Sequence, residues 1–101
     1  MNFPAQEAEQ RDEAAARLAA LKMNLDPRGV LSRLDGDTLA ILDPATDQTV
    51  DTISVRPWPP AQDAPWFHDC LDTPVADAND VIGAAVDIIG SLQRLGVRLH
   101  G

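Results

Sequence analysis

The chain has 101 residues, of which 45% are hydrophobic and 24% are charged, and its formal net charge at pH 7 is −8. This length and composition exclude a wholly disordered protein and leave room for one domain, which we expect over residues 1–101 with 1–5 and 97–101 loose. The negative charge disfavours direct binding to nucleic acid or to anionic lipid and favours a basic protein partner.

The acidity is concentrated in the middle of the chain. Between Leu34 and Gln93 there are eleven Asp, no Glu, and Arg56 as the only basic residue. Aspartate is common in turns and helix caps, because its short side chain accepts hydrogen bonds from nearby backbone amides. The aspartates therefore either serve turns and solubility or form one acidic recognition face that mimics DNA. The second interpretation requires several of six residues to cluster: Asp35, Asp37, Asp43, Asp47, Asp51 and Asp63.

The compartment follows from cysteine usage and from the apolar stretches. A lone Cys70 cannot close a disulfide within the chain, and the first ten residues lack the basic start and apolar run of a secretory signal. The most apolar stretch, Val81–Gly90, contains Asp87 and has about half the length needed to span a bilayer. We expect a cytoplasmic protein without a membrane span.

The first predicted element is a helix from Pro4 to about Asn24. Proline suits the first turn of a helix, and Asp26-Pro27 prevents the helix from continuing much further. The apolar stripe of this helix is narrow and consists of Leu18, Leu21 and Leu25. Such a helix either packs closely on a neighbour or serves as a detachable arm.

After Gly29 the apolar residues occur in short runs that are divided by turn residues, which is the pattern of strands. Asp35-Gly36-Asp37 is typical of a tight hairpin turn, and Asp43–Asp47 of a longer one. Four strands are predicted, over residues 30–34, 38–42, 49–55 and 66–69.

The last predicted element is a helix that begins at Asp77 or just after, with Asp77 as its cap, and stops before Gly96. Gly83 and Gly90 lie on nearly one face of this helix, and each costs about 1 kcal/mol relative to Ala. They indicate a close approach of backbones, either to the protein's own sheet or across a homodimer. The predicted core-facing stripe is Ala78, Ile82, Ala85, Ile89 and Leu92.

The stretch VRPWPPAQDAPWFHDC, residues 55–70, holds both tryptophans of the chain. In an extended strand Trp66 and Phe67 point to opposite faces; we place Trp66 in the core and Phe67 outside. Trp58 is flanked by prolines, which favour an extended conformation outside a central ladder, so it either covers a sheet edge or is an exposed anchor. The predicted partner contacts are Trp58, Arg56 and Phe67.

Residues for catalysis or metal binding are few. His68 and Cys70 are close in sequence, but no second cysteine or nearby histidine completes a zinc set, and His100 lies in the C-terminal tail. The chain has no Gly-rich phosphate loop and no serine nucleophile elbow. We predict no catalytic residue, no metal and no cofactor.

One resemblance covers about half of the chain. Ile53-Ser54-Val55-Arg56-Pro57, the proline-rich loop, Trp66-Phe67 and Pro74–Asp80 resemble the second half of a group of small acidic actinobacterial proteins of unassigned function. That group has a Cys where this chain has Val55 and a Glu where it has Thr73. The resemblance implies the order strand, strand, helix and no catalytic residue, and it assigns no activity.

Together these patterns predict an α+β fold: an N-terminal helix, a four-stranded, mainly antiparallel meander, and a C-terminal helix packed on the sheet. The predicted function is a non-catalytic protein-binding or regulatory adaptor, with an acidic inhibitor or DNA mimic as the alternative and an enzyme as a distant third. Besides the helix stripe, the predicted core consists of Leu18, Leu21, Leu39, Ile41, Ile53, Val55 and Trp66.

Overall fold

The computed structural model of the protein describes residues 3–97, and side chains from Arg11 to Val97. Of the predicted loose ends, residues 3–5 belong to the first helix and residue 97 is described, whereas residues 1–2 and 98–101, His100 among them, lie outside the described residues. In chain order the elements are α1 (Phe3–Leu25), the short 3-10 helix η1 (Asp26–Arg28), β1 (Leu31–Asp35), β2 (Thr38–Leu42), β3 (Thr49–Trp58), the 3-10 helix η2 (Pro59–Ala61), β4 (Ala64–His68), β5 (Pro74–Asp77) and α2 (Val81–Arg94).

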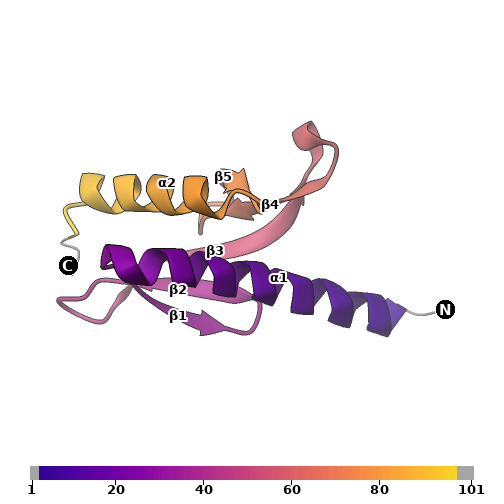
Figure 1. The fold of residues 1–101 in the computed structure, drawn as a ribbon, viewed down its shortest axis with the longest axis horizontal. Coiled ribbons are helices and arrows are strands. Elements are labelled where there is room, and N and C mark those ends of the chain that lie inside the picture. The colour runs from indigo at the N-terminus through magenta and orange to yellow at the C-terminus, as the bar shows by residue number, and fades with distance from the viewer. Residues whose placement is uncertain (1–2, 98–101) are drawn as a thin grey trace.

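The strands form one sheet in the order β1-β2-β3-β4-β5, and every neighbouring pair is antiparallel (Figure 1). The α+β class, the two helices and the meander confirm the prediction, whereas the strand number is five and not four. The missed strand, β5, has only four residues and begins with Pro74. Proline is acceptable at the first position of an edge strand, but it removes the usual sequence signature of a strand.

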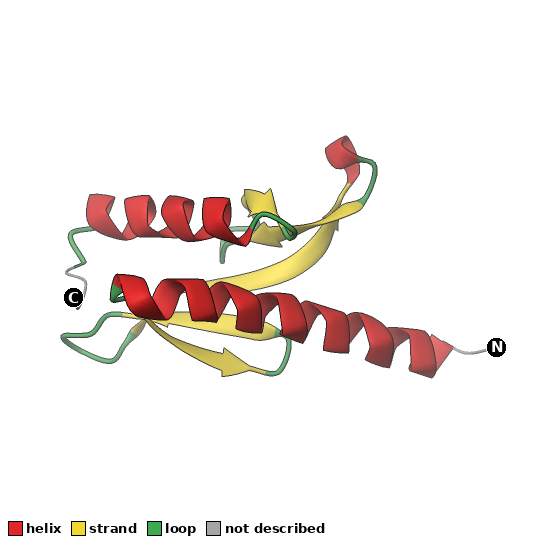
Figure 2. Ribbon diagram, viewed as in Figure 1, coloured by secondary structure: helices red, strands yellow, loops and turns green. Residues whose placement is uncertain are grey.

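Both helices cover the same face of the sheet. Side by side, α1 contacts β1, β2 and β3, while α2 contacts α1 and β5 (Figures 1 and 2). One cluster of buried side chains joins the layers; from α1 it includes Leu18, Leu21 and Leu25, from the sheet Leu39, Ile41, Ile53, Phe67 and Ala76, and from α2 Ala84, Ala85, Ile88 and Leu92. The C-terminal part of α1 is therefore packed on its neighbours and is not a detachable arm. The N-terminal end of α1 extends past the sheet (Figure 1).

The alternation in β4 is opposite to the prediction. Phe67 is 0% exposed and packs in the core beneath the helices, whereas Trp66 is only half-buried and lies on the other face. The register decides this outcome: Phe67 pairs with Val55 and Ala76, whose side chains share its face. The placement of Trp66 in the core was wrong.

Helix α2 begins later and is rotated relative to the prediction. Its N-cap is Asp80, whose Oδ1 accepts a hydrogen bond from the Gly83 N–H at 3.0 Å, while Asp77 instead accepts one from Asn79 in the preceding turn. Ile82, predicted for the core, is 62% exposed, and Ile89 is only partly buried. The apolar residues of this helix surround most of its circumference, so their spacing does not identify the face that packs on the sheet.

Strand β3 continues three residues beyond its predicted end, through Pro57 to Trp58. Pro57 stands directly opposite Pro65 of β4 in the ladder. Since neither proline has an N–H, this pair occupies a position where the ladder requires no donor from either strand. Trp58 therefore lies at the end of a central strand and not at a sheet edge.

The described part of the chain, residues 3–97, contains no helix long and apolar enough to cross a membrane.

Candidate binding surface on the uncovered face of the sheet

The sheet face opposite the two helices carries no other element among residues 3–97. Because cross-strand partners share a face, the register assigns side chains to this surface. Its middle contains the small residues Thr38, Ala40, Thr52 and Ser54, flanked by Asp35 and Arg33 on β1 and by His68 on β4. At the end of the sheet near the β3–β4 turn its members are Arg56, Trp58, Ala64, Trp66 and Asp77.

The two tryptophans form a pair on this surface, which we call the tryptophan pair. The ring centroids of Trp58 and Trp66 are 4.4 Å apart, and the ring planes are tilted by 55°. Both side chains are half-buried, and the Trp66 Nε1 is buried without a hydrogen-bond acceptor in the described chain. The sequence predicted separate places for the two rings: Trp66 in the core, and Trp58 as an exposed anchor or as the cover of a sheet edge. They form instead one aromatic patch next to the hairpin tip.

Arg56 lies directly opposite Trp66 in the ladder and forms an ion pair with Asp72 of the β4–β5 turn. Both side chains are about half exposed or more, at 48% and 64%. An ion pair so exposed contributes little to stability, but it holds the guanidinium beside the aromatic patch. Of the predicted partner contacts, Arg56 and Trp58 thus lie on one surface, and Phe67 is withdrawn because it is completely buried.

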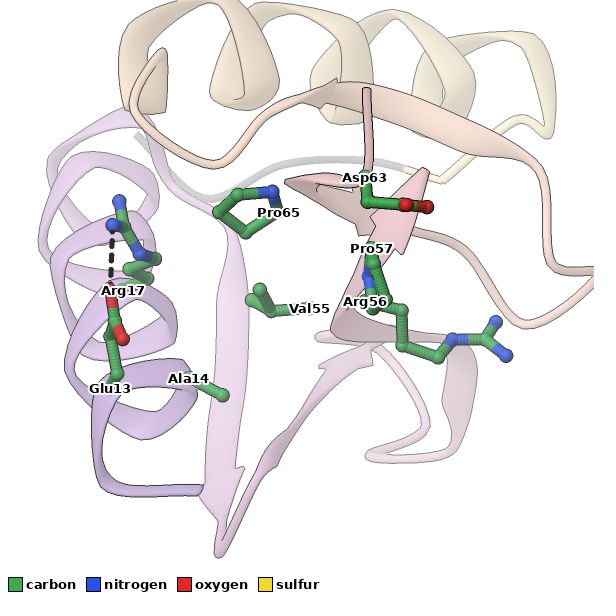
Figure 3. Close-up of a pocket in the computed structure, with 8 residues that line it drawn as sticks. All are labelled: Glu13, Ala14, Arg17, Val55, Arg56, Pro57, Asp63 and Pro65. Atoms are coloured by element: carbon green, nitrogen blue, oxygen red, sulfur yellow. Dashed lines mark hydrogen bonds and ion pairs between the residues drawn. The ribbon is translucent and has the colours of Figure 1, made fainter. Parts of the chain in front are cut away.

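A pocket of about 260 Å³ lies on the other side of β3, between α1 and the β3–β4 hairpin (Figure 3). Ala14, Val55 and Pro65 provide apolar walls, and at its edge Arg17 donates to the Glu13 carboxylate at 3.0 Å. Arg17 also donates to the Asn79 side chain, which ties α1 to the turn before α2. The arginine therefore fastens two elements together, and the pocket walls contain no histidine, cysteine or serine.

His68 and Cys70 occupy different environments. The His68 ring is buried, with its Nδ1 3.0 Å from the carbonyl oxygen of Trp66, while Cys70 is exposed. The pKa of the Cys70 thiol is raised, first by its hydrogen bond to Asp51 and then by desolvation and by the negative charges of Asp51 and Asp69. A raised pKa lowers the thiolate fraction and hence the nucleophilicity of the sulfur. Within the described chain no three His, Cys, Asp or Glu side chains are placed to hold a metal ion.

The aspartates are spread over both ends of the sheet. In an antiparallel meander successive turns lie at opposite ends, so Asp35, Asp37 and Asp63 lie at one end and Asp43 and Asp47 at the other. Many aspartates accept hydrogen bonds from the backbone: Asp43 from Ala45, Asp51 from Thr52 and Cys70, Asp69 from Leu71 and Thr73, Asp77 from Asn79, and Asp80 from Gly83. This is the arrangement expected for turn formation.

The edge of the sheet at β1 is partly occupied. Lys22 of α1 donates to the carbonyl oxygen of Ser32 at 2.9 Å and to its hydroxyl at 3.3 Å. This lysine of α1 places a charge at the edge strand and occupies one of its backbone acceptors, which hinders the addition of a foreign strand there.

The two glycines of α2 have different surroundings. A Cβ built on Gly83 would overlap the Asp80 carboxylate, so the helix cap requires the absence of a side chain at this position. A Cβ built on Gly90 would meet only the Arg94 guanidinium, at 3.5 Å. The Asp80 cap thus explains why position 83 is a glycine, whereas no contact within the described chain requires a glycine at position 90.

Comparisons with protein-family models, with curated proteins and with solved structures find no match to this chain. The resemblance of residues 53–80 to small acidic actinobacterial proteins stays a prediction.

Proposed function

We propose that this protein is a small, non-catalytic binding module that engages a basic protein partner in the cytoplasm through the uncovered face of its sheet. The observation that carries the proposal is the tryptophan pair, Trp58 on Trp66, beside Arg56 on a face without a helix. Tryptophan and arginine are the residues most enriched where binding energy concentrates in protein interfaces. A rigid aromatic patch also loses little conformational entropy on binding.

The charges near the pair favour a basic partner. Asp77 lies opposite Trp66 in the ladder, and the backbone N–H of Asp63, in the hairpin turn, donates to the Trp58 carbonyl oxygen at 3.1 Å, while its carboxylate has no hydrogen bond or ion pair within the described chain. A lysine or arginine of the partner placed over the Trp58 ring gains a cation–π interaction together with the attraction of these carboxylates. The net charge of −8 also favours a basic partner during association, because long-range attraction raises the association rate.

The unpaired indole of Trp66 adds support. A buried N–H without an acceptor costs about 1–3 kcal/mol. A carbonyl oxygen of the partner that accepts a hydrogen bond from the Trp66 Nε1 would recover that free energy.

The alternative, an acidic inhibitor that mimics DNA, has less support. Mimicry of a phosphate backbone requires a continuous array of carboxylates, whereas the aspartates of the turns lie at two ends of the sheet, and Asp43 and Asp51 accept hydrogen bonds from backbone amides. The exposed surface with the most interface-like composition is aromatic.

The test compares Trp58→Ala with Met23→Ala, a matched truncation of a large side chain that is 74% exposed on α1, in the layer away from the proposed surface. The partner is captured from an extract of the native cells by the immobilised wild-type protein, then purified and titrated with the wild type and both variants by calorimetry. We expect Trp58→Ala to weaken binding by about 2 kcal/mol, roughly thirtyfold, and Met23→Ala to leave it unchanged.

Thermal unfolding of the same variants separates binding from folding. The aromatic contact contributes about 0.5–1.5 kcal/mol beyond the area that the ring buries, so Trp58→Ala should lower stability less than truncation of a core aromatic residue does. An unchanged affinity together with a large fall in melting temperature would show that Trp58 only covers Trp66, and the proposal would be wrong.

A further inference from the structure

Helix α2 presents a second surface, on the side turned away from the core. Two of its apolar residues, Ile82 and Val86, are one helical turn apart and are 62% and 59% exposed. Single exposed apolar residues are common, but two neighbours on one helix face, next to a glycine, form a small patch. The 3.6-residue period places Gly90 one turn beyond Val86 on this same outer face. We call Ile82, Val86, Asp87, Gly90 and Arg94 the outer face of α2.

The charges on this outer face have no ion partner within the described chain. Asp87 and Arg94 are both exposed; Arg94 donates only to the Ser91 hydroxyl, at 3.1 Å, and Asp87 makes no ion pair. Of the other described basic side chains, Arg17, Lys22 and Arg56 form ion pairs with acids, whereas Arg28 and Arg33 do not. An acid and a base that remain unpaired on one apolar face are complementary to the same face of another molecule.

We propose that the outer face of α2 binds a second copy of this chain, with the two α2 helices antiparallel across a twofold axis. In this arrangement Val86 packs over Gly90 of the second copy, where the absence of a side chain lets the helices approach. Side chains on a helix lean toward its N-terminus, so Arg94 extends toward Asp87 of the second copy, and the twofold axis repeats both contacts. Ile82 packs on the aliphatic part of Arg94 of the second copy.

The charges of Asp87 and Arg94 favour antiparallel helices, and they favour a second copy of this chain over another protein as the binding partner. In a parallel twofold pair the flanks that carry Asp87 and Arg94 would lie on opposite sides of the contact, so neither ion pair could form. A basic partner, favoured elsewhere on this acidic protein, would meet Arg94 on this face. A second copy offers both the acid and the base in the required positions, although its net charge is −8.

The inference goes beyond the proposed function, because it concerns the opposite layer of the molecule. A dimer through α2 leaves the uncovered sheet faces of both copies accessible, and hence two tryptophan pairs. A partner with two binding sites would then be held more tightly by avidity, without any new contact. The small area of one helix face predicts a weak dimer that dissociates on dilution.

Charge reversal provides the test. Sedimentation velocity of the wild type, from about 10 µM to about 1 mM, is expected to show a monomer–dimer equilibrium. Asp87→Arg and Arg94→Asp should each raise the dimer dissociation constant by about tenfold or more, because each places like charges together. The double variant restores both pairs with opposite polarity and should return the constant to within about threefold of the wild type.

Asp37→Arg and Arg33→Asp are the matched controls. They make the same changes of net charge in the β1–β2 turn and on β1, both exposed and distant from α2, and should leave the dissociation constant of the dimer close to that of the wild type. Circular dichroism confirms that each variant is folded. A wild type that is monomeric throughout the range, a dimer that both single reversals leave intact, or a double variant that does not recover would each overturn the proposal. A dimer lost in Trp58→Ala and unaffected by charge reversal would assign self-association to the uncovered sheet face instead.

Discussion

At the scale of single residues, Trp66 and Phe67 show how one step along a strand changes the role of an aromatic side chain. Phe67 faces the helices and is 0% exposed, whereas its neighbour is half-buried against Trp58 on the other face. The two residues are equally apolar in the sequence. The difference arises because side chains of a strand alternate between faces and only one face of this sheet is covered by helices.

We therefore expect Phe67→Ala to lower the free energy of unfolding by about 3–5 kcal/mol, because it leaves a cavity in the core. Trp66→Ala should cost clearly less, since this side chain already contacts solvent and its removal creates no closed cavity. Urea denaturation followed by far-UV circular dichroism measures both changes without relying on tryptophan fluorescence. An equal or larger loss for Trp66→Ala would contradict the assignment of faces.

The reactivity of Cys70 is a second residue-scale prediction. The hydrogen bond and negative charge of Asp51 raise the pKa of the thiol, so the thiolate forms at higher pH in the folded protein than in the unfolded chain. We expect the midpoint of the alkylation rate against pH to lie higher for the native protein than for the protein in urea. Asp51→Asn should lower the native midpoint, and Asp63→Asn, in the hairpin turn, should not. Equal midpoints in the folded and unfolded states would contradict the prediction.

At the scale of elements, α2 contains two glycines whose surroundings differ. The Asp80 cap at the helix N-terminus occupies the space in which a Gly83 side chain would lie, whereas Gly90 has room for a methyl group. Both glycines lower the helix propensity by about 1 kcal/mol relative to Ala, so an equal gain at both positions would be expected from the sequence alone.

The structure predicts unequal gains. Gly90→Ala should stabilise the monomer by about 0.5–1 kcal/mol, while Gly83→Ala should give no gain, because displacing the Asp80 carboxylate removes a cap worth about 1 kcal/mol. In the Asp80→Ala background the cap is already absent, and Gly83→Ala should then stabilise. Denaturation of the wild type and the four variants at low protein concentration, where dimerisation does not contribute, measures these changes. Equal effects at the two glycines would show that the cap is not formed.

At the scale of the whole molecule, the two proposed binding surfaces lie on opposite layers of the fold. The fold has a helix layer, which carries the outer face of α2, and an uncovered sheet face, which carries the tryptophan pair. These surfaces point away from each other, so self-association and partner binding do not compete. The net negative charge favours a basic partner over nucleic acid.

We accordingly expect no saturable binding to a labelled DNA duplex of about 20 base pairs at low salt, because repulsion from the phosphates is strongest there. Fluorescence anisotropy measures this directly, with a basic DNA-binding protein as the positive control. A salt-sensitive rise in anisotropy would contradict the prediction and would indicate a basic patch that the net charge conceals.

Much of the fold follows from local sequence. Asp26-Pro27 ends α1, Asp35-Gly36 and Asp43-Pro44 form turns between strands, and the three corresponding strands lie where the apolar runs predict them. These features depend on backbone conformations that a few neighbouring residues impose, so they can be predicted without knowledge of the rest of the chain. The short strand β5 escaped prediction because its proline and aspartate resemble a turn.

The candidate surface depended on tertiary structure. The sequence indicates that Trp58 and Arg56 are candidate contacts, but it does not show that Trp58 would pair with Trp66 or that Phe67 would be buried. The same limit applies to α2, where Ile82 and Ile88 are equally apolar and only the second is buried. Which face of a strand or helix is covered depends on the packing of elements far apart in the sequence. Composition and local spacing determined the class of fold and its acidity, while the position of two helices on one side of the sheet decided which side chains remain available to a partner.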